Sequence, residues 1–129
     1  MAVIGVGVDA VEIGRLRAAL ERSPRLLGRL FTERERALCT SRCGQLRFGG
    51  LAARFAAKEA VAKALGTGVR GFGFRDVEVL PDAGGRPRVT LHDGAGRVAA
   101  ERGVDRVHVS LSHTHDLAVA HAVAEGPRI

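Results

Sequence analysis

The sequence predicts an α+β fold in which an antiparallel β-sheet packs against one long alanine-rich helix, within a single domain spanning residues 1–129. Two observations carry this prediction. Apolar residues recur at helical spacing in much of the first half of the chain, and most of the second half alternates between apolar and polar residues. A chain of 129 residues with 46% hydrophobic residues is long and apolar enough to bury a core.

The chain opens with a predicted strand over residues 3–9, because apolar side chains occupy every second position there. Ile4, Val6 and Val8 share one face of this strand, whereas two glycines share the other face with Asp9. Glycine inside a strand often marks a place where a neighbour comes close to the backbone. We therefore expect a bulky group to approach the Asp9 carboxylate.

Two helices are expected next. Apolar residues recur at helical spacing over residues 12–22, and Ser23-Pro24 ends this pattern. Thr32 and Glu35 are spaced as a capping box, in which the hydroxyl caps the first turn and the carboxylate reaches back to the backbone. This pair predicts a helix over residues 32–39.

The strongest helical pattern covers residues 51–65, which are rich in alanine, the best helix former, and which precede Gly66 in the C-cap position. Glycines are frequent on both sides of this helix. Residues 41–50 therefore predict a connection, and residues 67–73 predict a mobile loop.

The second half of the chain is expected to be mostly β. Alternating patterns predict strands at residues 74–80, 88–92, 107–112 and 117–123. The first two form a hairpin around a Gly-Gly turn within residues 81–87. A short helix is expected over residues 98–102, before the last two strands.

The charge balance points to an acidic partner. Lysine and arginine exceed aspartate and glutamate, which gives a formal net charge of +6. Nucleic acid, an acidic protein and a polyphosphate-bearing cofactor are the partners that such a charge favours. Trp and Tyr are absent, and five Phe supply every aromatic ring, which counts against single-strand binding by base stacking.

The chain shows no sign of a membrane segment or of export. No apolar run approaches the roughly 20 residues needed to cross a bilayer, and the first residues lack the features of a signal peptide. We therefore expect a cytoplasmic protein that is not attached to a membrane. Cys39 and Cys43 are expected to be reduced thiols there.

Asp9 and Glu59 are the first candidates for chemistry, and each has two interpretations. Asp9 either caps the helix that follows it or offers a carboxylate to a metal ion. Glu59 either forms a surface ion pair with Lys63 or is a metal ligand between Lys58 and Lys63, which then hold phosphate oxygens. If the first strand packs on the alanine-rich helix, the two carboxylates converge. Two oxygen ligands without nitrogen or sulfur donors suit Mg²⁺.

Two further groups of polar residues stand out. His113 lies between Ser112 and Thr114 before the last strand, where hydroxyls and an imidazole suit a phosphate or nucleotide; the alternative is a solvated turn histidine. Three arginines of the first helix and the segment after it are either a solvated face or a docking patch for an acidic partner: Arg15, Arg22 and Arg25.

Four ordered motifs give the chain a family resemblance. They are Gly-Val-Gly-Val-Asp-Ala-Val-Glu-Ile at residues 5–13, Phe-Thr-Glu-Arg-Glu at 31–35, Arg-Phe-Ala-Ala-Lys-Glu-Ala at 54–60 with Lys-Ala-Leu-Gly at 63–66, and Val-Ser-Leu-Ser-His-Thr at 109–114. Together they resemble the holo-[acyl-carrier-protein] synthases, the small single-domain class of 4′-phosphopantetheinyl transferases. The similarity spans nearly the whole chain.

The resemblance implies a reaction and a role for each motif residue. Coenzyme A donates its 4′-phosphopantetheine arm to a serine of an apo acyl carrier protein, releasing adenosine 3′,5′-bisphosphate and supporting fatty acid or polyketide synthesis. Asp9 and Glu59 are implied to hold Mg²⁺, Lys63 to stabilise the leaving group, and Glu59 is the candidate base. The residues implied to contact coenzyme A are Arg54, Lys58, Ser112, His113 and Thr114.

Assembly and docking also follow from the resemblance. The family implies a homotrimer with active sites between subunits, so that the His113 loop faces Asp9 and Glu59 of another subunit. The three arginines named above are expected to dock the acidic recognition helix of the carrier protein. The competing hypothesis is a small basic RNA-binding module without catalysis.

Overall fold

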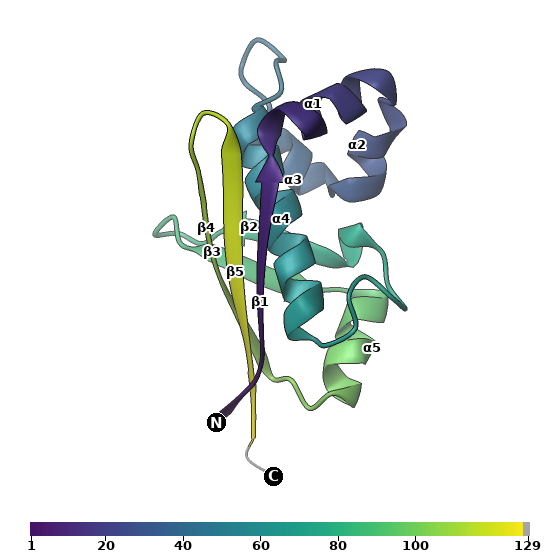
Figure 1. Ribbon diagram of the computed structural model, residues 1–129, viewed down its shortest axis with the longest axis vertical. Helices are drawn as coiled ribbons and strands as arrows, with labels where there is room; N and C mark the ends of the chain where they lie inside the picture. Colours follow the sequence, from purple (N-terminus) through teal and green to yellow (C-terminus); the bar gives the residue numbers. More distant parts are fainter. Residues whose placement is uncertain (128–129) are drawn as a thin grey trace.

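The computed structural model describes residues 1–127 and confirms the predicted α+β class (Figure 1). The first part of the described chain forms β1 (Ala2–Glu12), α1 (Ile13–Arg22), α2 (Arg25–Leu30), α3 (Glu33–Leu38) and α4 (Phe48–Ala64). The rest forms the 3₁₀ turn η1 (Phe74–Asp76), β2 (Val77–Pro81), β3 (Pro87–Leu91), α5 (Asp93–Glu101), β4 (Arg106–His113) and β5 (Leu117–Gly126). Within residues 1–127, no helix combines the length and apolar character needed to span a membrane.

The main sheet is antiparallel and has the strand order β1-β5-β4, so the first and last strands are neighbours although they are far apart in sequence. β1 pairs with β5 from Ala2 to Glu12, with a register shift between Val3 and Gly5. The β2–β3 hairpin forms a separate two-stranded sheet. α4 packs against the main sheet, with α1 and α2 at one end of the molecule and α5 at the other (Figure 1).

Two glycines allow β1 to lie directly on the backbone of α4. An ideal Cβ atom at Gly5 would lie 2.0 Å from the carbonyl oxygen of Ala64, and one at Gly7 would lie 2.0 Å from that of Ala60. The group that the glycines admit is therefore α4 itself, which corrects the expectation of a bulky group approaching Asp9. The side of β5 that shares this core carries four buried alanines: Ala118, Ala120, Ala122 and Ala124.

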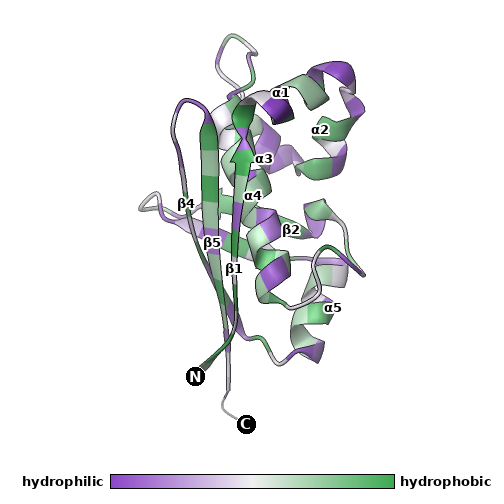
Figure 2. Cartoon of the chain, in the orientation of Figure 1, coloured by the Kyte–Doolittle hydropathy of each residue, from purple (hydrophilic) through white to green (hydrophobic). Residues whose placement is uncertain are grey.

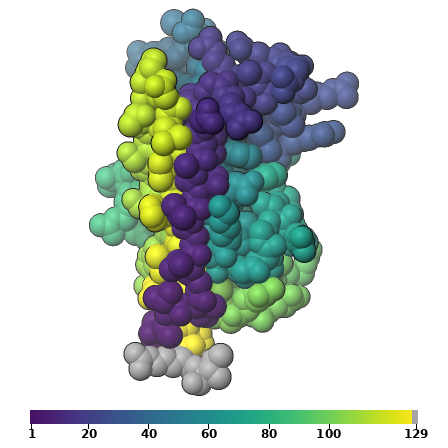
Figure 3. All heavy atoms as spheres, viewed as in Figure 1, coloured from purple at the N-terminus to yellow at the C-terminus, as the bar shows by residue number. Residues whose placement is uncertain are grey.

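The apolar side of β1 faces away from the core. Val3, Ile4, Val6 and Val8 are between 42% and 67% exposed. β1 and β5 lie side by side on this face in Figure 3, and Figure 2 shows hydrophobic residues along both strands. The predicted alternation is thus present, but the glycine side is the buried one. An aliphatic patch of this kind is typical of an interaction surface.

Three predicted elements begin three or more residues away from the observed start. α4 begins at Phe48 instead of residue 51, and α5 covers Asp93–Glu101 instead of residues 98–102. Glycines lie near the beginning of both helices, and their low helix propensity argued against a helix there. Packing against the rest of the fold stabilises these first turns. Residues 74–76 form a 3₁₀ turn, so the strand expected from residue 74 begins only at Val77.

A buried ion pair connects α3, α4 and the start of β2. Lys58 is 1% exposed, and its Nζ atom lies 2.8 Å from Oε1 of the fully buried Glu35. Nζ also donates to the carbonyl oxygens of Phe74, at 3.0 Å, and Val77. Burial lowers the pKa of Lys58, and the Glu35 carboxylate opposes this effect. The other Glu35 oxygen accepts the backbone N–H of Val79 at 2.8 Å.

The expectation that Lys58 contacts coenzyme A phosphates is wrong, because acceptors within the protein use its three N–H donors. The predicted capping box is confirmed: Thr32 and Glu35 exchange hydrogen bonds of 2.9 and 3.2 Å. The Thr32 hydroxyl also donates to buried Glu78 at 2.6 Å, and His92 lies 3.1 Å from the other Glu78 oxygen. Although burial would raise the pKa of Glu78, these two contacts hold it below its usual value.

Replacing Gly7 with alanine should destabilise the fold, because the new Cβ would meet the backbone of a buried helix. We expect the free energy of unfolding to fall by about 1–3 kcal/mol, as for other overpacked cores. Urea unfolding followed by circular dichroism measures this loss. Gly73→Ala is the control, because Gly73 has an ordinary φ of −99° and no atom within 4 Å of its Cβ position. Equal stability of both variants would contradict the close packing.

Replacing Lys58 with methionine should be more damaging than the same change at Lys63. Methionine keeps most of the aliphatic stem but leaves the Glu35 charge buried without its partner, which costs about 3–5 kcal/mol. Lys63 lies on the same helix and its side chain is 49% exposed, so Lys63→Met should cost less than about 1 kcal/mol. Similar unfolding midpoints for the two variants in urea would show that the buried pair contributes little.

Candidate active site

Asp9 meets α4 through Lys63. The Nζ atom of Lys63 donates to the carbonyl oxygen of Val8 at 2.9 Å and lies 3.3 Å from Oδ1 of Asp9, whose side chain is 21% exposed. Asp9 lies inside β1, and the N-cap of α1 is Glu12, which makes no side-chain capping hydrogen bond. The interpretation of Asp9 as a helix cap is therefore wrong.

Glu59 lies one turn before Lys63 on α4 and is half-buried. Among the ion pairs of residues 1–127, none joins Glu59 to Lys63, so the surface pair that their spacing favoured does not form. Burial raises the pKa of the Glu59 carboxyl, the Asp9 carboxylate raises it further, and Lys63 opposes both. Asp9 and Glu59 are thus close enough to repel each other, which is the convergence that packing of the strand on the helix predicted.

A groove of about 660 Å³ opens beside these two carboxylates. Arg15 of α1 lines it, together with Phe55 and Phe74, whose rings stack with their centroids 5.3 Å apart. The remaining lining is mostly aliphatic: Ala10, Val11, Leu16, Ala19, Leu26 and Leu30, beside Glu12. The groove therefore combines three carboxylates and a guanidinium with an apolar wall.

The donor set at the groove fits a hard divalent cation. Residues 1–127 contain no group of three or more His, Cys, Asp or Glu side chains placed to hold a metal ion. Asp9 and Glu59 supply carboxylate oxygens alone, which leaves most coordination positions to water and phosphate oxygens, as Mg²⁺ prefers. A cation held by both carboxylates would relieve their repulsion and replace Lys63 as the counter-charge of Asp9.

Arg54 and His113 lie together in a second pocket of about 370 Å³. Arg54 donates from Nε to the carbonyl oxygen of Val79 at 3.1 Å and from Nη1 to that of Gly50 at 3.2 Å, which holds the guanidinium in the pocket wall. His113 reaches it from the end of β4, and Arg47 from the residue before α4. This pocket shares no lining residue with the groove at Asp9.

The second pocket is electropositive. α4 begins beside it without a side-chain cap or an acidic residue in its first turn, so the positive end of the helix dipole is uncompensated. Nδ1 of His113 lies 3.2 Å from the carbonyl oxygen of Thr114, which can only accept a hydrogen bond. Nδ1 therefore carries the proton of that hydrogen bond, and Nε2 is left for another partner.

Ser112 and Thr114 flank His113 but do not line its pocket. Ser112 is exposed on β4, opposite Val119. The hydroxyl of Thr114 accepts the backbone N–H of Leu117 at 3.2 Å and closes the turn between β4 and β5. Within one chain, these two hydroxyls lie beside the pocket and not in it.

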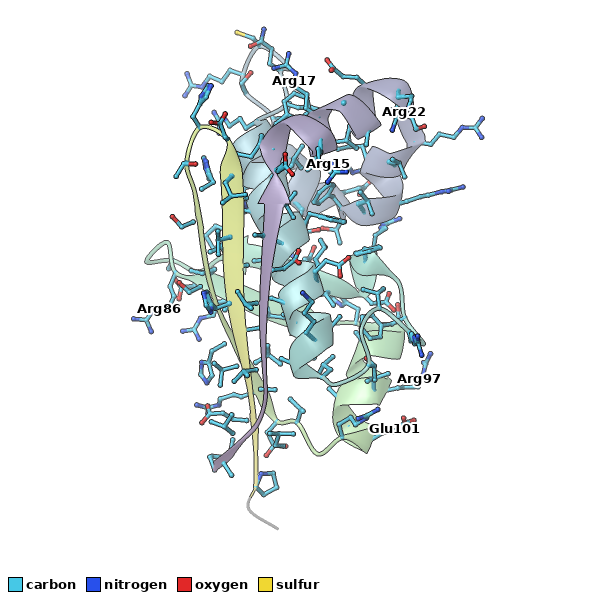
Figure 4. All side chains as sticks on the ribbon, viewed as in Figure 1. Arg15, Arg17, Arg22, Arg86, Arg97 and Glu101 are labelled. Atoms are coloured by element: carbon cyan, nitrogen blue, oxygen red, sulfur yellow. The ribbon has the colours of Figure 1, made fainter. Side chains whose placement is uncertain are left out.

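The three predicted docking arginines are exposed on and beside α1. Arg15 and Arg22 project from α1 at one end of the molecule (Figure 4), and Arg25 begins α2. The Arg15 side chain is 81% exposed, and its Nη1 atom lies 3.7 Å from Oε1 of Glu12. An ion pair this exposed contributes at most about 1 kcal/mol, so Arg15 can exchange it for a partner's carboxylate.

Sequence reasoning missed part of both sites. Phe55 was expected only as part of the alanine-rich helix and Phe74 as part of a strand, yet both line the groove. Arg47 was expected only as part of a connection, yet it lines the second pocket. The one signal for Phe55 was its place beside Arg54 in the third motif. Nothing in the local pattern of the other two residues indicated a site.

Comparisons with known proteins agree with this geometry. The sequence model of the 4′-phosphopantetheinyl transferase superfamily matches residues 5–122. A holo-[acyl-carrier-protein] synthase of Desulforudis audaxviator is 52% identical over 126 residues, covering 97% of this chain and 95% of the relative. That of Streptomyces coelicolor is 51% identical over 127 residues, covering 98% and 100%.

Solved structures give the same result. Holo-[acyl-carrier-protein] synthase of Neisseria meningitidis superposes with a TM-score of 0.85 at 36% identity, covering 96% of this chain and 99% of the other. An ACPS–CoA complex of Chronobacterium ammoniagenes superposes with a TM-score of 0.81 at 31% identity, covering 99% and 100%. The resemblance predicted from the four motifs is confirmed. This chain belongs to the 4′-phosphopantetheinyl transferase superfamily and, within it, to the holo-[acyl-carrier-protein] synthase family.

Proposed function

We propose that this protein transfers the 4′-phosphopantetheine arm of coenzyme A to a serine hydroxyl of an apo acyl carrier protein. The observation that carries this proposal is the meeting of Asp9, Glu59 and Lys63 where β1 packs on α4, beside a groove that the two carboxylates line. Two carboxylates and an ammonium group in one place suit the transfer of a phosphoryl group from a pyrophosphate. The relatives named above carry the same activity in their names.

Asp9 and Glu59 would hold Mg²⁺, which when bound offsets the negative charge of the coenzyme A pyrophosphate. The support for this assignment is the donor set of two converging carboxylates without a nitrogen or sulfur ligand. Lys63 would then be free of its contact with Asp9. Its ammonium group can turn toward the leaving phosphate, because its side chain is half exposed.

The proposed chemical step is a single displacement at phosphorus. The serine oxygen forms a bond to the β-phosphorus of coenzyme A, and the bond from that phosphorus to the bridging oxygen breaks. The electron pair leaves with the bridging oxygen as part of adenosine 3′,5′-bisphosphate, which Lys63 stabilises. Glu59 is proposed to take the serine proton, because its carboxylate lines the groove beside Asp9.

A homotrimer is proposed because one chain does not bring the two pockets together. Arg54 and His113 occupy a pocket that shares no lining residue with the groove at Asp9 and Glu59. The aliphatic face of β1 is exposed and suits burial against a second copy of the chain. Assembly about a threefold axis could place the His113 pocket of one subunit opposite the groove of its neighbour.

In such an assembly, coenzyme A would lie across the interface between two subunits. Arg54 and His113 would bind its phosphates from one side, since their pocket is basic and stands at a helix N-terminus. Ser112 is proposed as a further contact because it is exposed on β4. Thr114 would act mainly by fixing the turn after His113.

The carrier protein is proposed to dock at α1. Arg15 lines the groove that contains Glu59, and Arg22 and Arg25 are exposed nearby along the chain. The net charge of +6 favours an acidic partner over a basic one. Complementary charge of this kind speeds encounter and sets orientation, and its effect weakens as salt concentration rises.

Transfer can be tested by incubating the protein with coenzyme A, Mg²⁺ and an apo carrier protein and weighing the carrier by mass spectrometry. The wild type should add a phosphopantetheine group. Asp9→Asn and Glu59→Gln should lower the transfer rate on the order of 100-fold or more, because each removes a charge that acts in the transition state. Both should keep their thermal midpoint, since neither change alters core volume.

Glu101→Gln is the matched control, because it neutralises a carboxylate that lines neither pocket and lies on α5, at the end of the molecule opposite α1 (Figure 4). It should transfer at the wild-type rate. A wild-type protein that leaves the carrier mass unchanged would contradict the proposed function. Full activity of the Asp9 or Glu59 variant would remove that residue from the site.

A further inference from the structure

We propose that Gly49 is a positioning residue for His113. Because glycine has no side chain, the imidazole can lie against α4, and the affinity of the site for coenzyme A depends on this position. This inference rests on the proposed function, in which His113 binds coenzyme A phosphates. An ideal Cβ atom at Gly49 would lie 2.6 Å from Cε1, 2.7 Å from Nδ1 and 3.1 Å from Nε2 of His113. The imidazole edge therefore occupies the space that any larger residue would fill.

The backbone conformation at Gly49 does not require a glycine. Gly49 lies in the first turn of α4, outside the positive-φ glycines, where alanine is a much better helix former. The three atoms nearest to its Cβ position all belong to His113. Gly50, the next residue, has a different nearest neighbour, the Sγ atom of buried Cys39 at 3.2 Å. Contact with the imidazole is thus particular to Gly49.

Because the His113 imidazole lies against Gly49, it stays beside the arginines of the second pocket. His113 is exposed and ends β4, so core packing does not hold its ring in place. One hydrogen bond, from Nδ1 to the carbonyl oxygen of Thr114, fixes the ring orientation. The surface of α4 at Gly49 then brings Nε2 into the pocket that Arg54 lines.

A methyl group at position 49 would affect the stability of the fold and the binding of coenzyme A in different ways. The exposed imidazole can rotate away, so the fold should tolerate the change and gain from the better helix former. The rotated ring, however, would no longer face the pocket with Arg54. The inference therefore predicts that Gly49→Ala is neutral or stabilising for the fold and damaging for coenzyme A binding.

The test measures coenzyme A affinity by calorimetry for the wild type, Gly49→Ala, His113→Ala and the double variant, together with each thermal midpoint. Losing one charge-assisted hydrogen bond should weaken binding by roughly tenfold. Gly49→Ala should show this loss with an equal or higher midpoint, and it should add no further loss in the His113→Ala background. Gly14→Ala is the control, because Gly14 is also helical and has no atom within 4 Å of its Cβ position.

Two results would overturn the inference while leaving the proposed function standing. One is wild-type affinity in Gly49→Ala when His113→Ala binds weakly. The other is an equal loss from Gly49→Ala with and without His113, which would show that Gly49 does not act through the imidazole. If His113→Ala binds coenzyme A as the wild type does, the assignment of His113 in the proposed function fails, and the inference fails with it.

Discussion

The contact between β1 and α4 is closer than a strand with side chains on its inner face would allow. Gly5 and Gly7 bring the strand onto the carbonyl groups of Ala64 and Ala60, and the alanines of β5 continue the same thin interface. Because the glycines face inward, Asp9 on the same side of the strand arrives beside Lys63. The aliphatic residues of β1 must then face outward, where another chain can cover them. The meeting of Asp9 with Lys63 and the exposed aliphatic face of β1 therefore have one structural cause.

Beneath the groove, polar groups replace part of the apolar core. Lys58 is held by Glu35 and by the carbonyl oxygens of Phe74 and Val77, which fixes the turn that carries Phe74 into the groove wall. Breaking such a buried pair is costly, whereas its net contribution relative to an apolar core is small. Its main effect here is to define where α3, α4 and β2 meet. Two lysines on one helix thus have different surroundings: Lys58 is buried against Glu35, and Lys63 lies half exposed beside Asp9.

Local pattern was sufficient to predict the class of fold, the capping box at Thr32 and the convergence of Asp9 with Glu59. It could not predict that Lys58 is buried, because its partners come from α3 and from β2, which are distant in sequence. Nor could it predict the start of α4, since glycine propensity opposes a helix and only the tertiary neighbours of Gly49 account for that residue. The spacing of residues predicts a single helix or strand, whereas the burial of its side chains depends on the elements that pack against it.

The proposed trimer gives each chain two half-sites that meet only between subunits. It is tested most directly by co-expressing Glu59→Gln and His113→Ala chains with different tags and isolating trimers that contain both. Every mixed cyclic trimer has one interface with both half-sites intact, so transfer should recover to roughly one third of the wild-type rate. Mixed trimers no more active than either variant alone would contradict the account.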